Sequence, residues 1–150
     1  KYIFDDCISA WNLLGFGVDV NAEDGMKLNH MIWADNIYLM TDSISEMRHM
    51  IQDLTNKLYG AGMAWKDSSL QFMMGGSLTT TKPVISAYLP DGGELQFSHV
   101  YKLIVLGTAL DSRGSTPCTI NHAIARGNKV FWKFQTICNT RCAPKHKLAA

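Results

Sequence analysis

The residues best placed to do chemistry are Asp35 and Asn36, a polar dipeptide between two short apolar runs. The runs, residues 28–33 and 37–40, have the length and the aromatic and β-branched content of strands. Asp and Asn readily adopt the turn conformations that a two-residue hairpin loop needs. The sequence therefore predicts a hairpin that carries the Asp35 carboxylate at its tip, an oxygen ligand of the type that hard divalent cations take.

The elements around this hairpin are predicted from apolar spacing. Upstream, residues 5–14 form an amphipathic helix with Trp11 as a core anchor, and residues 18–20 a short strand. Downstream, Ser43 and Glu46 have the spacing of a capping box. Apolar residues then recur on one helix face, at Ile44, Met47, Met50, Ile51, Leu54 and Leu58. This order predicts an α+β fold with an antiparallel hairpin packed on amphipathic helices.

The segment Trp33-Ala34-Asp35-Asn36, followed by Ile37, Tyr38 and Leu39, resembles a known motif. It is similar to the aromatic-Ala-Asp-Asp motif of reverse transcriptases, particularly those of non-LTR (LINE-like) retrotransposons. The helix that follows, Gly62-Met63 after it, and Leu106-Gly107 with a basic helix downstream also resemble that family. The resemblance is strongest over residues 26–73, moderate over 103–140 and weakest over 5–20. A four-residue pattern often arises by chance, so the resemblance depends on the order of these elements along the chain and not on the motif alone.

The resemblance implies an RNA-directed DNA polymerase that uses an RNA template, a DNA primer and deoxynucleotides. Residues 1–113 would be the C-terminal part of its palm, and residues 114–150 the start of a thumb-like helical segment. Two cations, Mg²⁺ or Mn²⁺, would be held by clustered carboxylates. Asp35 would be a catalytic residue and a metal ligand. Asn36, also at the catalytic position, would replace a second aspartate with a neutral oxygen, which lowers cation affinity.

The sequence departs from the family in a second way. The family's first catalytic aspartate lies on an earlier strand, before a Gly-rich template-binding segment, and neither is present in this sequence. We therefore expect a fragment that does not polymerise DNA by itself. Polymerases of non-segmented negative-strand RNA viruses work with Gly-Asp-Asn at the comparable turn, so Asn36 alone does not imply an inactive parent.

Residues 61–74 predict a turn between two short strands, with Lys66 and Asp67 at the bend. The family commonly carries a lysine here, near the phosphates of the incoming nucleotide, and Ser69 takes that place. Lys66, three residues earlier, is the candidate to reach the same phosphates. The alternative is a solvated turn lysine.

The rest of the chain predicts a small meander and a basic helix. Residues 75–83 are a linker, and strands are expected over 84–89, 94–101 and 102–107. A helix then starts at Pro117, capped by Thr116 or Ser115. Three basic residues share one face of this helix, and the resemblance implies that they hold the template–primer backbone: Arg126, Lys129 and Lys133.

Charge is distributed unevenly along the chain. Residues 1–112 hold seven Lys or Arg against all thirteen Asp and Glu, a balance of −6. Residues 113–150 hold the other seven Lys and Arg and no acid, a balance of +7. Phosphate contacts supply most non-specific nucleic-acid affinity, so a polyanionic partner is one interpretation. A solvated basic helix face is the other.

Composition sets outer limits. Apolar residues at 47% and charged residues at 18% are typical of an ordinary globular domain. Apolar runs are far too short to span a bilayer and no leader opens the chain, so we expect an intracellular protein, in cytoplasm or nucleus, with no membrane partner. Cys138, Cys142 and His146, with His122 upstream, have zinc-ligand types but not a usual spacing, so we favour reduced cysteines over zinc.

Three functions remain open from the sequence. The first is a reverse-transcriptase fragment, and the second is a non-enzymatic nucleic-acid-binding module that acts through the helix from residue 117 onward. The third is an unrelated α+β domain in which Asp35-Asn36 is only a good turn dipeptide.

Overall fold

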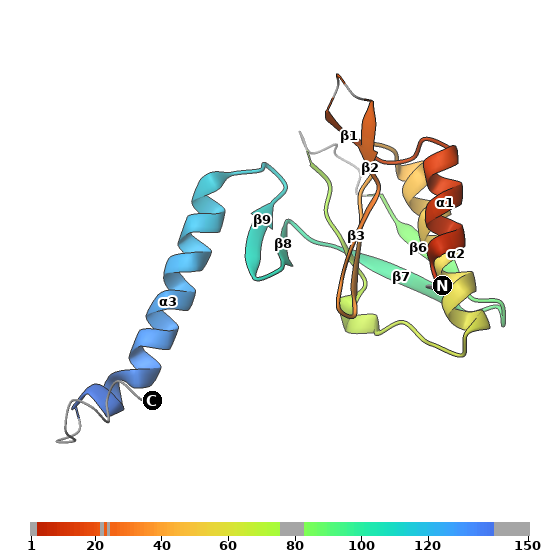
Figure 1. The fold of residues 1–150 in the computed structure, drawn as a ribbon. Coiled ribbons are helices and arrows are strands. Elements are labelled where there is room, and N and C mark those ends of the chain that lie inside the picture. Colours follow the sequence, from red (N-terminus) through yellow and green to blue (C-terminus); the bar gives the residue numbers. More distant parts are fainter. Residues whose placement is uncertain (1–2, 22, 24, 76–82, 140–150) are drawn as a thin grey trace. The chain divides into compact units, whose positions relative to one another are not determined.

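The computed structural model describes residues 3–21, 23, 25–75 and 83–139. This part of the chain contains helices separated by groups of short antiparallel strands, which confirms the α+β class (Figure 1). The chain forms two compact units. The first contains residues 1–71 and 81–99, and the second contains residues 72–80 and 100–150. The expected division into palm and thumb at residue 113 concerns function and stays a prediction.

The first unit begins with a helix, two strand pairs and a long helix. The pairs are β1 with β2 and β3 with β4, both antiparallel. The elements are α1 (Asp5–Leu13), β1 (Val18–Asn21), β2 (Met26–Leu28), β3 (His30–Trp33), β4 (Asn36–Leu39) and α2 (Ile44–Gly60). The predicted helices and the strand over residues 18–20 are confirmed. The apolar run 28–33 is divided, because Leu28 pairs with Val18 in the earlier hairpin.

The core of this unit lies between α1 and α2. Trp11 is 1% exposed and Met50 is fully buried, and both pack with Cys7 and Leu54. The predicted apolar face of α2 is confirmed, because Met50, Ile51, Leu54 and Leu58 are all buried. Burying a large apolar side chain contributes about 1.5–3 kcal/mol. Ile37 and Leu39 of β4 pack against this cluster, so the two helices support the β3–β4 hairpin.

The capping box expected at the start of α2 is replaced by another arrangement. Ser43 is the N-cap residue but its side chain makes no capping hydrogen bond, and its hydroxyl contacts that of Ser45 instead. Glu46 accepts a hydrogen bond from the hydroxyl of Thr41, which also accepts one from the Ser43 amide at 3.1 Å. Thr41, two residues before the N-cap, thus bonds to the Glu46 side chain in place of Ser43, the residue that the capping-box pattern pairs with Glu46.

A three-stranded sheet has the order β5-β7-β6. Its strands are β5 (Gln71–Phe72), β6 (Ile85–Tyr88) and β7 (Glu94–His99). The prediction of two strands over residues 61–74 is half wrong, because only β5 forms. Residues 67–69 form a short 3-10 helix, η1 (Asp67–Ser69), closed by hydrogen bonds from the amides of Ser69 and Leu70. Most of the predicted linker 75–83 lies outside the described residues.

The second unit contains a hairpin and a long helix. These are β8 (Lys102–Val105), β9 (Thr108–Asp111) and α3 (Thr116–Asn139). The expected third strand of the meander instead pairs with β9, which the sequence did not predict. Both loop residues, Leu106 and Gly107, have positive φ, 49° and 78°. Positive φ at both central residues is what a type I′ hairpin turn requires, and glycine meets it freely.

Candidate functional site

The tip of the β3–β4 hairpin is formed by Ala34 and Asp35. Trp33 pairs with Asn36, so Asn36 is the first residue of β4, and the predicted loop Asp35-Asn36 is wrong by one residue. Ala34 takes φ 54°, a left-handed conformation that costs a residue with a side chain about 1 kcal/mol. The observed register offsets this cost by placing Ile32 opposite Ile37 and forming other cross-strand contacts.

The tip displays one carboxylate. Asp35 and Asn36 are both exposed, beside Trp33, which is 63% exposed. Within the described part of the chain, the Asp35 carboxylate makes no hydrogen bond or ion pair. The described residues contain no group of three or more His, Cys, Asp or Glu able to hold a metal ion. Asp35 thus has the chemistry of a single oxygen ligand, and Asn36 can add a neutral amide oxygen.

The base of the hairpin is held by Asn29, which sequence analysis did not single out. Its side chain is 2% exposed, and its amide donates to Asn12 Oδ1 at 2.8 Å and to the Phe16 carbonyl at 3.3 Å. Its Oδ1 lies 2.6 Å from His30 Nδ1. The available signal was a lone amide inside the apolar run 28–33, because a buried polar side chain needs partners. Asn29 ties the hairpin to the end of α1.

His30 is held in one tautomer by this network. The Asn29 amide nitrogen donates to two oxygens, so its Oδ1 must accept and His30 Nδ1 must carry the hydrogen. Burial lowers the pKa of His30, because desolvation disfavours the charged imidazolium. Gly17 allows the segment after α1 to lie close to the backbone of Leu28, since a Cβ at Gly17 would lie 2.9 Å from the Leu28 carbonyl.

Lys66 is exposed and directly precedes η1. Its carbonyl accepts a hydrogen bond from the Ser69 amide at 2.8 Å. Lys66 and Ser69, the residues considered for the position of the family's lysine, therefore lie in one turn. Its expected contact with nucleotide phosphates stays a prediction.

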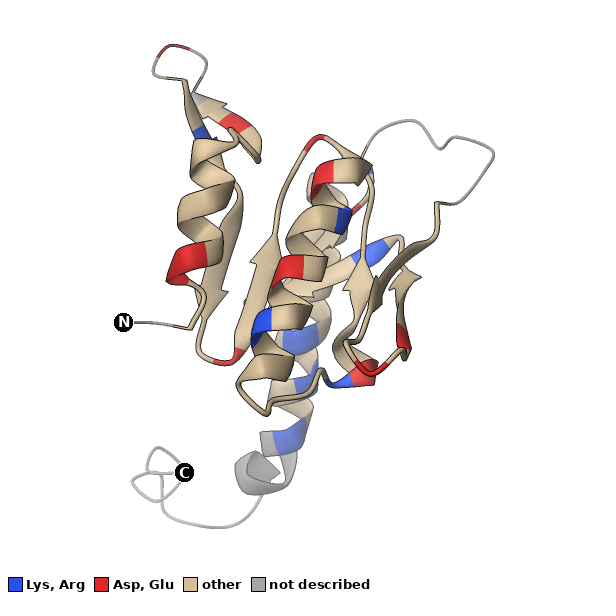
Figure 2. Ribbon diagram, turned by 90° about the vertical axis from the view of Figure 1, so that its right-hand side faces the viewer, with Lys and Arg blue, Asp and Glu red and all other residues tan. Residues whose placement is uncertain are grey.

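The three basic residues predicted to share one face of α3 differ in their contacts. Arg126 is exposed but donates from Nη1 to the Gly107 carbonyl at 2.7 Å, so it also ties the helix to the β8–β9 hairpin. Lys129 and Lys133 are exposed in the next turns. Figure 2 shows Lys and Arg recurring along α3, where no Asp or Glu occurs. Of the zinc-type residues, Cys142 and His146 lie outside the described residues.

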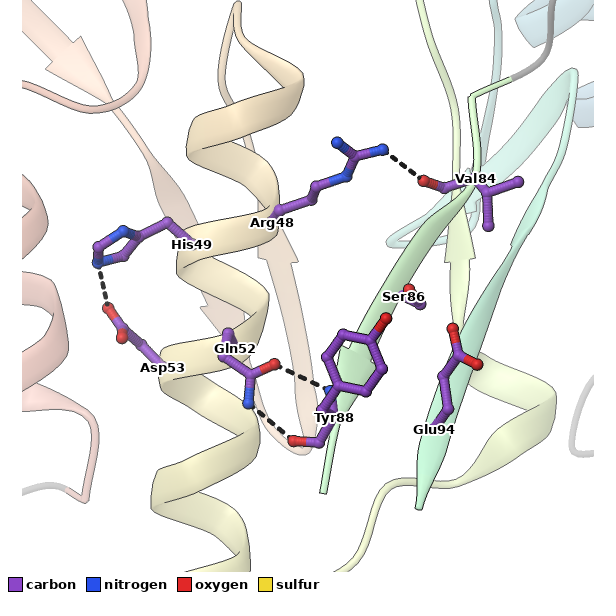
Figure 3. A pocket seen from close by; sticks show the side chains of 8 residues that line it. All are labelled: Arg48, His49, Gln52, Asp53, Val84, Ser86, Tyr88 and Glu94. Carbon is purple, nitrogen blue, oxygen red and sulfur yellow. Dashed lines mark hydrogen bonds and ion pairs between the residues drawn. The ribbon is translucent and has the colours of Figure 1, made fainter. Parts of the chain in front are cut away.

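A groove between α2 and β6 was not predicted from the sequence. It has a volume of about 780 Å³ (Figure 3). From α2, Arg48 Nη2 donates to the Val84 carbonyl at 2.9 Å, and Gln52 Nε2 donates to the Tyr88 carbonyl at 2.7 Å. In return, Gln52 Oε1 accepts from the Tyr88 amide at 2.9 Å. The only sequence signal was the spacing of Arg48 and Gln52, four residues apart on the polar face of a helix.

Comparison with known proteins gives no relative on which to base a function. No family model, curated protein or solved structure matches the chain. Among the described helices, none combines the length and the apolar character needed to cross a bilayer. The resemblance to reverse transcriptases therefore rests on the residues of this sequence, and the identity stays a prediction.

Proposed function

We propose that this chain is part of an RNA-directed DNA polymerase of the non-LTR retrotransposon type. In this proposal Asp35 binds a divalent cation that contacts the phosphates of a nucleotide. The observation that supports it is the exposed Asp35 carboxylate, which has no protein partner among the described residues, at the tip of a two-residue hairpin loop. A ligand for an exogenous ion must be accessible in this way.

The residues fit the cation only in part. Mg²⁺ or Mn²⁺ takes oxygen ligands and, in such enzymes, activates a primer hydroxyl and stabilises the departing pyrophosphate. Asp35 supplies one charged oxygen donor and Asn36 one neutral donor, and a pair of ions requires more carboxylates than this. We therefore assign one ligand to this chain and no complete reaction step, and we expect the isolated chain to be inactive.

Binding of Mn²⁺ tests the proposal directly. Because Mn²⁺ is paramagnetic, it should broaden the amide resonances of residues 33–37, and Asp35→Ala should abolish the broadening. Asp42→Ala is the matched control, because Asp42 is also exposed but lies outside the hairpin. Broadening that persists in Asp35→Ala, or that is lost equally in Asp42→Ala, would contradict the assignment.

Catalysis is tested on a longer chain that includes the upstream coding sequence. We expect that sequence to encode a strand with a further aspartate, followed by a Gly-rich turn. Primer extension on an RNA template should then require Mg²⁺ or Mn²⁺ and should be lost in Asp35→Ala. A start codon directly before the codon for Lys1, or activity unchanged in Asp35→Ala, would contradict the polymerase assignment.

The second candidate is a nucleic-acid-binding module that acts through α3. It is favoured by the exposed Lys129 and Lys133 on a helix in a segment without acids. Binding to RNA or DNA should weaken steeply with salt, and Lys129→Ala with Lys133→Ala should reduce the slope of log affinity against log salt by about one for each phosphate that the variant no longer binds. Lys57→Ala is the control, because Lys57 pairs with Asp6 in the first unit. An unchanged slope in the double variant would count against this function.

A further inference from the structure

Strand β6 has an outward-facing backbone edge. It is the outer strand of the sheet β5-β7-β6, and in antiparallel pairs alternate residues turn their N–H and C=O groups away from the partner strand. Leu89 donates its amide across the hairpin to Gly93 at 2.7 Å, whereas both backbone groups of Tyr88 bond to Gln52. Tyr88 therefore faces outward, and Ser86, two residues earlier, faces the same way.

Strand β7 confirms this alternation from the other side. The Ser98 amide donates to the Leu70 carbonyl at 2.9 Å, away from β6. Gln96, two residues earlier, must also turn its backbone groups away from β6. Gln96 is the register partner of Ser86, so this pair exchanges no backbone hydrogen bonds.

Side chains of α2 cover the edge of β6 on both sides of Ser86. Arg48 takes the Val84 carbonyl and Gln52 takes both backbone groups of Tyr88. Within the described residues, neither backbone group of Ser86 has a partner. Figure 3 shows Ser86 between these two contacts, on the strand that faces the helix. An adjacent donor and acceptor thus remain available in the groove.

Gln52 shows which chemistry fits such a pair. Its carboxamide is planar, with a donor beside an acceptor, and it pairs with the N–H and C=O of Tyr88. The edge of an amino-bearing nucleobase has the same planar arrangement, for example N6–H beside N1 in adenine. An added peptide strand fits less well, because it needs several consecutive outward residues and α2 occupies those at both sides of Ser86.

The two ends of the groove differ in charge. Arg48 uses Nη2 for Val84, which leaves the other guanidinium donors for an anion such as phosphate. At the other end, Tyr88 is 61% exposed and can stack on a base, and its register partner Glu94 can accept from an exocyclic amino group. Asp53 also lines the groove, where its carboxylate accepts a hydrogen bond from Trp11 Nε1 at 2.8 Å and lies 3.5 Å from His49 Nε2 (Figure 3).

We propose that this groove binds a nucleoside monophosphate with an amino-bearing base. The base pairs with the backbone of Ser86 and stacks on Tyr88, and the phosphate binds Arg48. The volume of about 780 Å³ lies in the range of about 300–1,000 Å³ that small-molecule sites occupy. The inference goes beyond the proposed function, because no residue of the hairpin tip or of α3 lines the groove.

The experiment is a titration of the ¹⁵N-labelled 150-residue chain with adenosine monophosphate to about 1 mM, the weak end of small-ligand affinity. The Ser86 and Tyr88 amides should shift, while those near Asp35 should not. Tyr88→Ala should weaken binding on the order of tenfold through loss of stacking. Ser86→Pro should abolish it, since proline lacks the outward N–H and an edge strand tolerates this loss. Gln96→Ala is the matched control and should bind normally.

Related ligands separate the alternatives. Adenosine should bind more weakly than adenosine monophosphate, and ribose 5-phosphate more weakly than both. The proposal is overturned if Ser86 does not shift, or if ribose 5-phosphate shifts it as strongly, which would indicate a phosphate site only. It is also overturned if an extended hexapeptide shifts Ser86 and adenosine monophosphate does not, or if folded Tyr88→Ala binds normally. Asp35→Ala should leave this binding intact, so a failure of the groove proposal can be distinguished from a failure of the proposed function.

Discussion

Replacing Asn29 should destabilise the first unit more than any exposed polar substitution in the hairpin. Asn29→Ala removes two donated hydrogen bonds, to Asn12 and to the Phe16 carbonyl, and one accepted from His30. Each net hydrogen bond contributes about 1 kcal/mol, and a buried partner left unpaired costs about 1–3 kcal/mol. Because some of these partners can rehydrate, we expect the free energy of unfolding to fall by about 3 kcal/mol.

Urea unfolding followed by circular dichroism measures this change as a lower midpoint at unchanged slope. Asn36→Ala is the control, because Asn36 is exposed in the same hairpin, and it should change the unfolding free energy by about 0.5 kcal/mol or less. Asn29→Asp keeps the side-chain volume but loses the donor, so hydrogen bonding predicts a loss at least as large. A loss below about 1 kcal/mol in Asn29→Asp would show that packing alone explains Asn29→Ala and would refute the reasoning.

Three further perturbations follow from the same structure. Trp11→Phe keeps most of the core but loses the 2.8 Å hydrogen bond to Asp53, so it should cost about 1 kcal/mol in urea unfolding, against about 3–5 kcal/mol for Trp11→Ala. Gly107→Ala should lower the melting temperature, because φ is 78° and a Cβ would lie 2.5 Å from Arg126 Nη1, and adding Arg126→Ala should restore only the part due to the contact. Burial lowers the pKa of His30 in the folded state, so the unfolded chain binds the proton more readily. The stability contributed by neutral His30 should be complete above about pH 6.5 and decline as the pH falls toward the folded pKa, and His30→Gln should flatten unfolding free energy measured against pH over that window.

Apolar spacing predicted the helices and much of the core. Trp11 and the face of α2 containing Met50 and Leu54 are buried as expected. A helix face is fixed by many residues together, so a single unusual position does not change it. The capping arrangement at Glu46 was less predictable, because its choice between Thr41 and Ser43 depends on the path of the preceding loop.

Features decided by one residue or by tertiary contacts were missed. The hairpin loop moved by one residue because Ala34 accepts a positive φ, and strand β9 formed because Leu106 does the same beside Gly107. The alternative loop conformations differ in free energy by about 1 kcal/mol, a difference that local sequence patterns do not resolve. The groove depends on Gln52 meeting the backbone of Tyr88, 36 residues later in the chain, so no local pattern contains it.

The position of Asn36 allows a sharper test of the hairpin as a cation ligand. Asn36→Asp places a second carboxylate next to Asp35, and added ligand charge should tighten Mn²⁺ binding on the order of tenfold. Without the ion, two neighbouring carboxylates repel, so the variant should be less stable than the original chain in metal-free buffer. Mn²⁺ should recover this loss, because a ligand that binds only the folded state stabilises it.

Thermal unfolding with and without Mn²⁺ separates this effect from simple damage to strand β4. Asn36→Ser serves as the control, because it also removes the amide from the first position of β4 but adds no charge. Equal destabilisation of Asn36→Asp in both buffers, or unchanged Mn²⁺ affinity, would contradict cation binding at the tip. Recovery specific to Asn36→Asp would instead place the ion beside residues 35 and 36, because only there does the new charge act on it.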